Sequence, residues 1–254
     1  MSLLDAIAGD APSRDTLFAP SAAKSGFTDA DVQALLSLRR TLHHFPELSS
    51  EEHQTSARLI ATLQSLGVAE IERVAGTGIV ARIPGQHADV PLIALRGDID
   101  ALPITEQTGL SFASSVPGVM HACGHDVHAS WTIGAAMSLL REPAEGDVLI
   151  VLQPAEEIGA GARAILDSGA LDGVAAIFGA HVDRRFVVGE VIAEAGPLAA
   201  SADSFTITLH GRGAHGARPH EAADPIVAAA AGITALQTLG ARRIDPARPA
   251  DCTV

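Results

Sequence analysis

The chain has 254 residues, a formal net charge of −13, an apolar fraction of 47% and only 3% aromatic residues. This length suits one large α/β domain or one and a half, and it provides ample material for a core. The negative charge argues against binding to nucleic acid or to anionic membranes, because both require basic patches. The scarcity of aromatic side chains also argues against a surface on which bases stack.

The predicted location is the cytoplasm. The two cysteines, Cys123 and Cys252, stand far apart in dissimilar contexts, which fits a reducing compartment better than a disulfide framework. The first thirty residues contain no continuous apolar stretch, so we expect no signal peptide. No apolar run approaches the length of a membrane span, and we therefore expect no membrane partner.

The first elements are predicted from turn residues and capping patterns. Residues 1–27 are rich in turn-forming residues and predict a weakly ordered leader. Thr28 and Asp31 then form a capping-box pattern ahead of an amphipathic run, which predicts a helix that ends near Pro46.

A second capping-box pattern follows at Ser49 and Glu52, and it predicts a helix that stops at Gly67. Strands and helices are expected to alternate after it. The predicted strands cover residues 71–75, 78–83, 91–96, 147–152 and 174–180, and the predicted helices cover residues 125–141 and 161–168. We expect the last strand to be buried, and the order predicts an α/β fold with a mostly parallel sheet and helices on both faces.

The stretch from Met120 to His128 contains three histidines, one cysteine and one aspartate. Side chains of these types bind Zn²⁺ and similar divalent ions. Gly124 permits a tight turn between Cys123 and His125, just before the predicted helix. A polar loop with helix-capping residues is the alternative interpretation, but the density of ligand-type residues favours a metal site.

Acidic and imidazole side chains also follow three predicted strands at the points where they end: Asp98 and Asp100, Glu156 and Glu157, and His181. Ligands bind at the carboxyl ends of strands in open α/β sheets. A metallohydrolase needs one carboxylate to hold the metal and another to accept a proton from water. The adjacent Glu156 and Glu157 fit these two tasks, although the pattern does not decide which residue performs which.

With these residues, the chain resembles the dinuclear metallo-amidohydrolases. This family includes hippurate hydrolases, N-acyl-amino-acid hydrolases and auxin–amino-acid conjugate hydrolases, and it is related to aminoacylase and carboxypeptidase. The matching stretches lie at residues 38–48, 94–104, 120–128, 153–157, 179–182 and 211–220. The resemblance implies a zinc-exopeptidase-like catalytic domain over residues 28–198. It also implies that residues 199–254 begin a smaller α+β lid domain, through which such enzymes form homodimers.

The resemblance further implies the roles of individual residues. The metal ligands would be Cys123, His125, Glu157 and His181, with Cys123 bridging two ions. Glu156 would be the general base, and Asp98 and Asp100 would orient the ligands. His215 would stabilise the oxyanion in the partner's active site, and His128 would either pack on its helix face or support the ligands. The cofactors would be up to two divalent ions per subunit, Zn²⁺ or Mn²⁺, with Ni²⁺ or Co²⁺ as further candidates.

The implied reaction is hydrolysis of the amide bond of N-acyl amino acids or small peptide-like substrates by metal-activated water. In the lid region, residues 204–211 alternate between apolar and polar types, which predicts a strand, and a helix is expected over residues 224–239. Members of the family continue beyond the point that corresponds to Val254 and supply a final metal-binding histidine there. We therefore expect that the chain is truncated at its C-terminus.

Two alternatives to this hydrolase stay open from the sequence. The chain could be an inactive fragment that keeps partial metal binding or associates through its lid. It could also be a hydrolase in which Cys123, helped by a nearby histidine, is the nucleophile.

Overall fold

The computed structural model describes residues 26–193, 195–196, 203–245 and 252–253. The chain divides into two compact units, Met1–Val188 and Gly189–Val254. The predicted leader lies outside the described residues, apart from its last two positions. The predicted domain boundary between residues 198 and 199 also lies outside them, and it stays a prediction.

The first unit begins with helices α2 (Asp29–His44) and α3 (His53–Ser65). The predicted capping box of α2 is present in full, because Thr28 and Asp31 each bind the other's backbone N–H. The second capping box is wrong. Glu52 is the residue at the start of α3, but its side chain caps nothing there, and the Ser49 hydroxyl donates to Asp100 Oδ2 at 2.7 Å instead.

Five strands form one sheet: β1 (Glu70–Val74), β2 (Gly78–Ile83), β3 (Leu92–Asp98), β4 (Val148–Gln153) and β5 (Val174–Gly179). Their spatial order is β1-β2-β4-β3-β5. Strand β3 pairs in parallel with both β4 and β5, whereas β2 pairs antiparallel with β1 and β4. The α/β fold is confirmed, with the correction that the sheet is mixed where β2 enters it.

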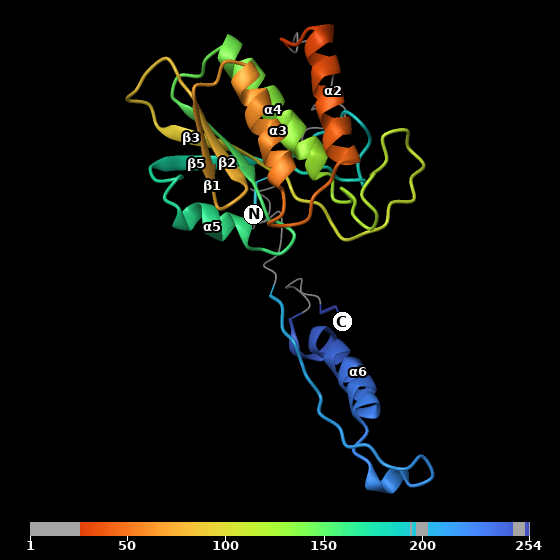
Figure 1. The fold of residues 1–254 in the computed structure, drawn as a ribbon. Helices are drawn as coiled ribbons and strands as arrows, with labels where there is room; N and C mark the ends of the chain where they lie inside the picture. The colour runs from red at the N-terminus through yellow and green to blue at the C-terminus, as the bar shows by residue number, and fades with distance from the viewer. Residues whose placement is uncertain (1–25, 194, 197–202, 246–251, 254) are drawn as a thin grey trace, which may run out of the picture. The chain divides into compact units, whose positions relative to one another are not determined.

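Helices cover both faces of the sheet, as predicted (Figure 1). On one face α2, α3 and α4 (His125–Arg141) pack with Ile150 and Leu152 of β4 in the larger core. On the other face α5 (Gly161–Asp167) contributes Ile165 to a smaller core with Leu149 and Val151 of the same strand. Every residue of β4 is buried, because alternate side chains enter the two cores.

Strand β5 differs from β4 and corrects the expectation of a buried strand. It lies at one edge of the sheet, and its residues after Val174 are exposed, including Ile177 and Phe178 at 51% and 55%. An apolar run shows that a segment can be buried, but it does not show which neighbours are present to bury it.

The second unit contains the 3-10 helix η1 (Pro219–Glu221) and helix α6 (Pro225–Arg243). The predicted start of α6 is confirmed, because the Asp224 carboxylate accepts from the N–H groups of Ile226 and Val227. The strand predicted over residues 204–211 is wrong. Among the residues that the structure describes, this segment has no paired neighbour, and alternation of residue types cannot supply one.

Candidate metal centre

The candidate site is built where β3, β4 and β5 end and α4 begins. Cys123 and His125 flank Gly124, which has a φ of 93° in the left-handed region. A Cβ atom on Gly124 would lie 2.4 Å from Val182 Cγ2, so a side chain is excluded there for two reasons. The absence of a side chain lets this turn approach the segment after β5, which carries His181.

Cys123, His125 and His181 each offer a ligand atom within 4.8 Å of the others. Cys123 Sγ lies 3.3 Å from His181 Nε2. The Nδ1–H of His181 donates to the carbonyl oxygen of Val182 at 2.7 Å, which leaves the lone pair of Nε2 directed at the thiol. A thiol and an imidazole arranged in this way match the donor set that zinc-like ions prefer.

His125 has the same tautomer and supports the same interpretation. Its Nδ1–H donates to the carbonyl oxygen and Oδ1 of Asp100 at 3.0 and 3.1 Å. Its Nε2 is buried without a hydrogen-bond partner and lies 3.7 Å from both Glu156 Oε2 and Glu157 Oε1. The Glu157 oxygen is itself buried without a hydrogen-bond partner. A cation placed between these acceptors would satisfy both of them, so the residues fit a metal ion.

Burial and the neighbouring carboxylates shift the acid–base behaviour of this cluster. Burial raises the pKa of Glu157, with a further contribution from Glu156. Burial and Glu157 raise the pKa of Cys123 to about 12. A cysteine nucleophile needs a lowered thiol pKa, whereas a metal ion can itself displace the proton. The environment of Cys123 therefore suits a metal ligand better than a free nucleophile.

Asp100 connects two of the predicted ligands. Its Oδ1 accepts from His125, and its Oδ2 accepts from the Glu157 backbone N–H at 3.0 Å and from Ser49 Oγ at 2.7 Å. Although burial opposes ionisation, these hydrogen bonds lower the pKa of Asp100 to about 2. Asp100 therefore contacts both His125 and Glu157, as its predicted role of orienting these two residues requires.

Asp98 and His128 form a second buried pair. His128 Nδ1–H donates to Asp98 Oδ1 at 2.6 Å, and His128 Nε2 accepts from the Val182 N–H at 3.0 Å. Both ring nitrogens are therefore engaged, so His128 supports the segment that carries His181 and is not free to bind a metal. Asp98 Oδ2 is paired with Arg96 at 2.7 Å.

A further network at the start of α4 was given no role from the sequence. Asp126 Oδ2 lies 2.7 Å from Arg39 Nε and 2.9 Å from His43 Nδ1, and His43 Nε2 lies 3.2 Å from Glu106 Oε1. The hydrogen bond that His43 Nδ1–H donates to the Asp126 carboxylate raises the pKa of His43. Because Asp126 follows His125, this network fixes the helix start that carries His125, a predicted ligand. The signal for it in the sequence is that Arg39, His43 and Asp126 fall in two of the stretches that carry the family resemblance.

His215 is not brought into this cluster by any described contact. It lies in the second unit, where it is exposed and its Nδ1 accepts from the Ala217 N–H at 3.1 Å. Its predicted role at a partner's active site stays a prediction.

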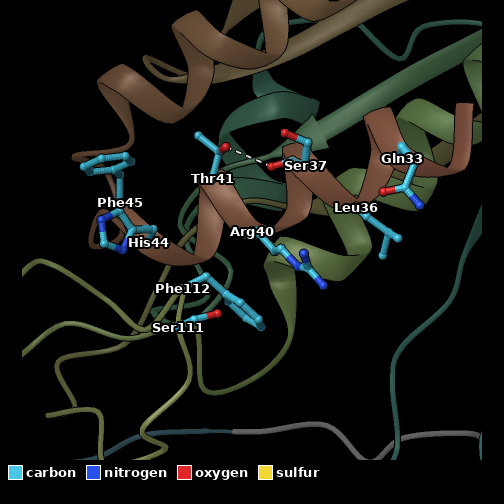
Figure 2. A pocket seen from close by; sticks show the side chains of 9 residues that line it. All are labelled: Gln33, Leu36, Ser37, Arg40, Thr41, His44, Phe45, Ser111 and Phe112. Atoms are coloured by element: carbon cyan, nitrogen blue, oxygen red, sulfur yellow. Dashed lines mark hydrogen bonds between the residues drawn. The ribbon is translucent and has the colours of Figure 1, made fainter. Parts of the chain in front are cut away.

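A pocket of about 340 Å³ lies elsewhere, on α2 and the loop that carries Phe112 (Figure 2). Arg40, Thr41 and His44 contribute to its lining, and Arg40 lies over the ring of Phe112 at 5.3 Å. None of the predicted site residues lines this pocket. The candidate metal centre is thus recognised by its donor atoms and not by this pocket.

The chain is similar to hydrolases over most of its length. It is 44% identical to N-acetyl-L-cysteine deacetylase of Bacillus subtilis, across 87% of this chain and 53% of that protein. It is 42% identical to IAA-amino acid hydrolase ILR1-like 5 of Arabidopsis thaliana, across 84% of this chain and 49% of that protein. The chain thus spans about half the length of these curated relatives.

A solved structure from Bacillus subtilis, described as a dinuclear metal-binding peptidase from the M20 family, matches with a TM-score of 0.59 and 49% identity. The match covers 61% of this chain and 44% of the other. The model of peptidase family M20/M25/M40 matches residues 94–251, which include every cysteine, histidine and glutamate of the candidate centre. The chain therefore belongs to peptidase family M20/M25/M40.

Proposed function

We propose that the protein is a metal-dependent amidohydrolase that cleaves the amide bond of N-acyl amino acids or small peptide-like substrates. The observation that carries this proposal is the pair of buried, unpartnered acceptors, His125 Nε2 and Glu157 Oε1, in a cluster that also contains Cys123 and His181. The substrate class is supported by two relatives, one a deacetylase of N-acetyl-L-cysteine and the other a hydrolase of IAA-amino acids.

Cys123, His125, Glu157 and His181 would hold the metal ions. When bound, such ions lower the pKa of water and polarise a carbonyl group. Glu156 is the general base that accepts a proton from the attacking water and then delivers it to the leaving amine. Its side chain is 39% exposed, against 19% for Glu157, which fits a base facing substrate beside a ligand facing the metal.

Other features of the proposal follow from the chemistry of the donor set and from the resemblance. Thiolate with imidazole suits Zn²⁺, and the carboxylates also admit Mn²⁺, Ni²⁺ or Co²⁺. Homodimerisation through the second unit, with His215 stabilising the oxyanion of the partner's substrate, is the proposed assembly. The two cysteines, far apart in the sequence, support a cytoplasmic location. No helix in the described part of the chain is long and apolar enough to cross a membrane.

The test combines metal content with turnover. We expect a transition metal to co-purify with the wild-type protein and to be lost from the Cys123→Ser/His125→Ala double variant, because too few ligands remain. Glu156→Gln should keep the metal and lose nearly all hydrolysis of an N-acetyl amino acid, because an amide cannot accept the proton. Elemental analysis and amine release measure the two properties.

Equal metal content in the wild type and the double variant would overturn the site. Hydrolysis that survives a chelator and depends on Cys123 would instead support a cysteine nucleophile. Wild-type protein that binds metal but releases no amine would favour the inactive-fragment alternative, for which the share of the relatives' length covered by this chain is the supporting observation.

A further inference from the structure

Glu52 is a carboxylate buried to 0% exposure, and none of the ion pairs found among the described residues involves it. Its Oε1 accepts from the Ala155 backbone N–H at 2.8 Å, and its Oε2 accepts from Thr77 Oγ1 at 2.5 Å. Burying an acidic group without a cation is unfavourable. The burial of Glu52 therefore calls for a physical reason, and its hydrogen bond to Ala155 supplies one.

Ala155 lies in the turn that leads from β4 to Glu156 and Glu157, and its φ is 48°. This left-handed conformation is disfavoured for a residue with a Cβ atom, so the surroundings must hold it. Glu52 binds the N–H of Ala155, and the carbonyl oxygen of Ala155 accepts from the N–H groups of Ala160 and Gly161, both at 3.1 Å. The turn is thus held by hydrogen bonds at both of its peptide groups.

Two glycines pack closely against Pro154, the residue before Ala155 in the same turn. A Cβ atom on Gly161 would lie 1.6 Å from the Pro154 carbonyl oxygen, and one on Gly78 would lie 2.8 Å from Pro154 Cδ. These close approaches place backbone directly against Pro154 on two sides. Glu52 therefore makes one of several contacts that fix the backbone conformation of residues 154–155.

This turn decides where the two following glutamates lie. Glu156 and Glu157 each place a carboxylate oxygen 3.7 Å from His125 Nε2, and the N–H of Glu157 is held separately by Asp100. If Ala155 relaxed out of the left-handed region, the backbone of both glutamates would rotate with it. A ligand and a general base tolerate displacements of only a fraction of an ångström.

We propose that Glu52 is a positioning residue for Glu156 and Glu157, acting through the N–H of Ala155, with Thr77 orienting Glu52. This inference rests on the proposed metal-dependent function. It assigns Glu52, the acid of the second capping-box pattern, to the metal centre and not to the start of helix α3.

The test is a Co²⁺ titration of the whole 254-residue chain, followed by the visible absorption of the bound ion and by its dissociation constant. Glu52→Leu fills the same space but accepts no hydrogen bond from Ala155. It should weaken Co²⁺ binding by about 10–100-fold, as the loss of a group supporting a metal ligand typically does, and should change the ligand-field bands. Glu52→Gln can still accept from Ala155 and can donate to Thr77, so it should retain wild-type binding and spectrum.

Leu59→Ala is the matched control, because Leu59 is buried in the same helix α3 but belongs to the larger core and not to the turn. It should lower the melting temperature and leave the Co²⁺ spectrum unchanged. Thr77→Val keeps the Glu52 carboxylate but removes one of its donors, so it should weaken binding in the same direction by a smaller factor.

Wild-type Co²⁺ binding in Glu52→Leu would overturn the positioning role, as would an equal loss in Leu59→Ala, which would reveal a merely structural effect. If Glu52→Leu does not fold, wild-type binding and spectrum in Thr77→Val overturn the role instead. A wild-type chain whose Co²⁺ spectrum is the same as that of Cys123→Ser would overturn the metal site itself, and the positioning role with it. The two failures are therefore distinguishable.

Discussion

Helices α2 and α6 begin with equally clear signals, yet they differ in what surrounds them. Thr28 caps α2 and Asp224 caps α6, each by accepting backbone N–H groups. Helix α2 then contributes Leu42 to a core shared with α3, α4 and the sheet. Helix α6 has no buried residue, and no described residue after Val188 is buried. Local signals thus start a helix, whereas its stability comes from the apolar surface that it buries.

The largest expected effect comes from separating the two units. A chain limited to residues 26–188 should unfold cooperatively on heating, because it contains both cores. A chain limited to residues 189–254 should show no cooperative transition, because nothing in its described part is buried. Circular dichroism during heating measures both. A sharp transition in the second piece would contradict the expectation that this unit has no core of its own.

A smaller effect is expected when one apolar residue is shortened in each unit of the intact chain. Ile150→Ala removes a fully buried side chain from β4, and it should lower the free energy of unfolding by about 2–5 kcal/mol. Ile233→Ala changes a side chain that is 47% exposed on α6, and the expected change is within about 0.5 kcal/mol. Denaturant titration compares the two variants, and equal losses would show that α6 is buried in solution.

The smallest effect concerns ion pairs and pH. The hydrogen bonds from Arg141 and Thr28 hold the pKa of Asp31 below its ordinary value. A depressed carboxyl pKa stabilises the fold above the unfolded-state value of about 3.9 and loses this contribution as the pH falls through the folded-state value. The melting temperature of Asp31→Asn should therefore lie below that of the wild type at neutral pH.

The difference between Asp31→Asn and the wild type should then shrink below about pH 4, where the unfolded chain begins to bind the proton. Glu221→Gln is the matched variant in the second unit, where the Arg218–Glu221 pair is exposed and spans 3.6 Å. It should leave the melting temperature unchanged at every pH. A difference for Asp31→Asn that persists undiminished into acid would contradict the assigned cause.

Much of the first unit was predictable because its signals are local. The capping box at Thr28, the buried run of β4 and the polar residues at the strand ends each indicate structure within a few positions. The same locality explains the failures. Ser49 matches a capping pattern, but its hydroxyl meets Asp100, which is 51 residues away. The entry of β2 between β1 and β4 likewise depends on pairing, which alternation within a single strand does not encode.

The candidate site was predictable as a set of residue types and less so as an arrangement. The strand ends indicated where Asp98, Asp100 and the two glutamates would gather. The sequence did not indicate that His128 has both nitrogens engaged, since that depends on Asp98 and on the backbone of Val182. Nor did it indicate the role of Glu52, because the sequence pattern alone does not distinguish a buried glutamate from one that caps a helix.

The carboxylate of Asp100 has a consequence for how this sequence can vary over evolutionary time. Three groups depend on it together: the Ser49 hydroxyl, the His125 ring and the Glu157 backbone. A replacement that suits one partner leaves the other two unsatisfied, so single substitutions are blocked even where each partner alone could adapt. We expect change at this position only alongside compensating changes in its neighbours, which makes Asp100 a centre of epistasis.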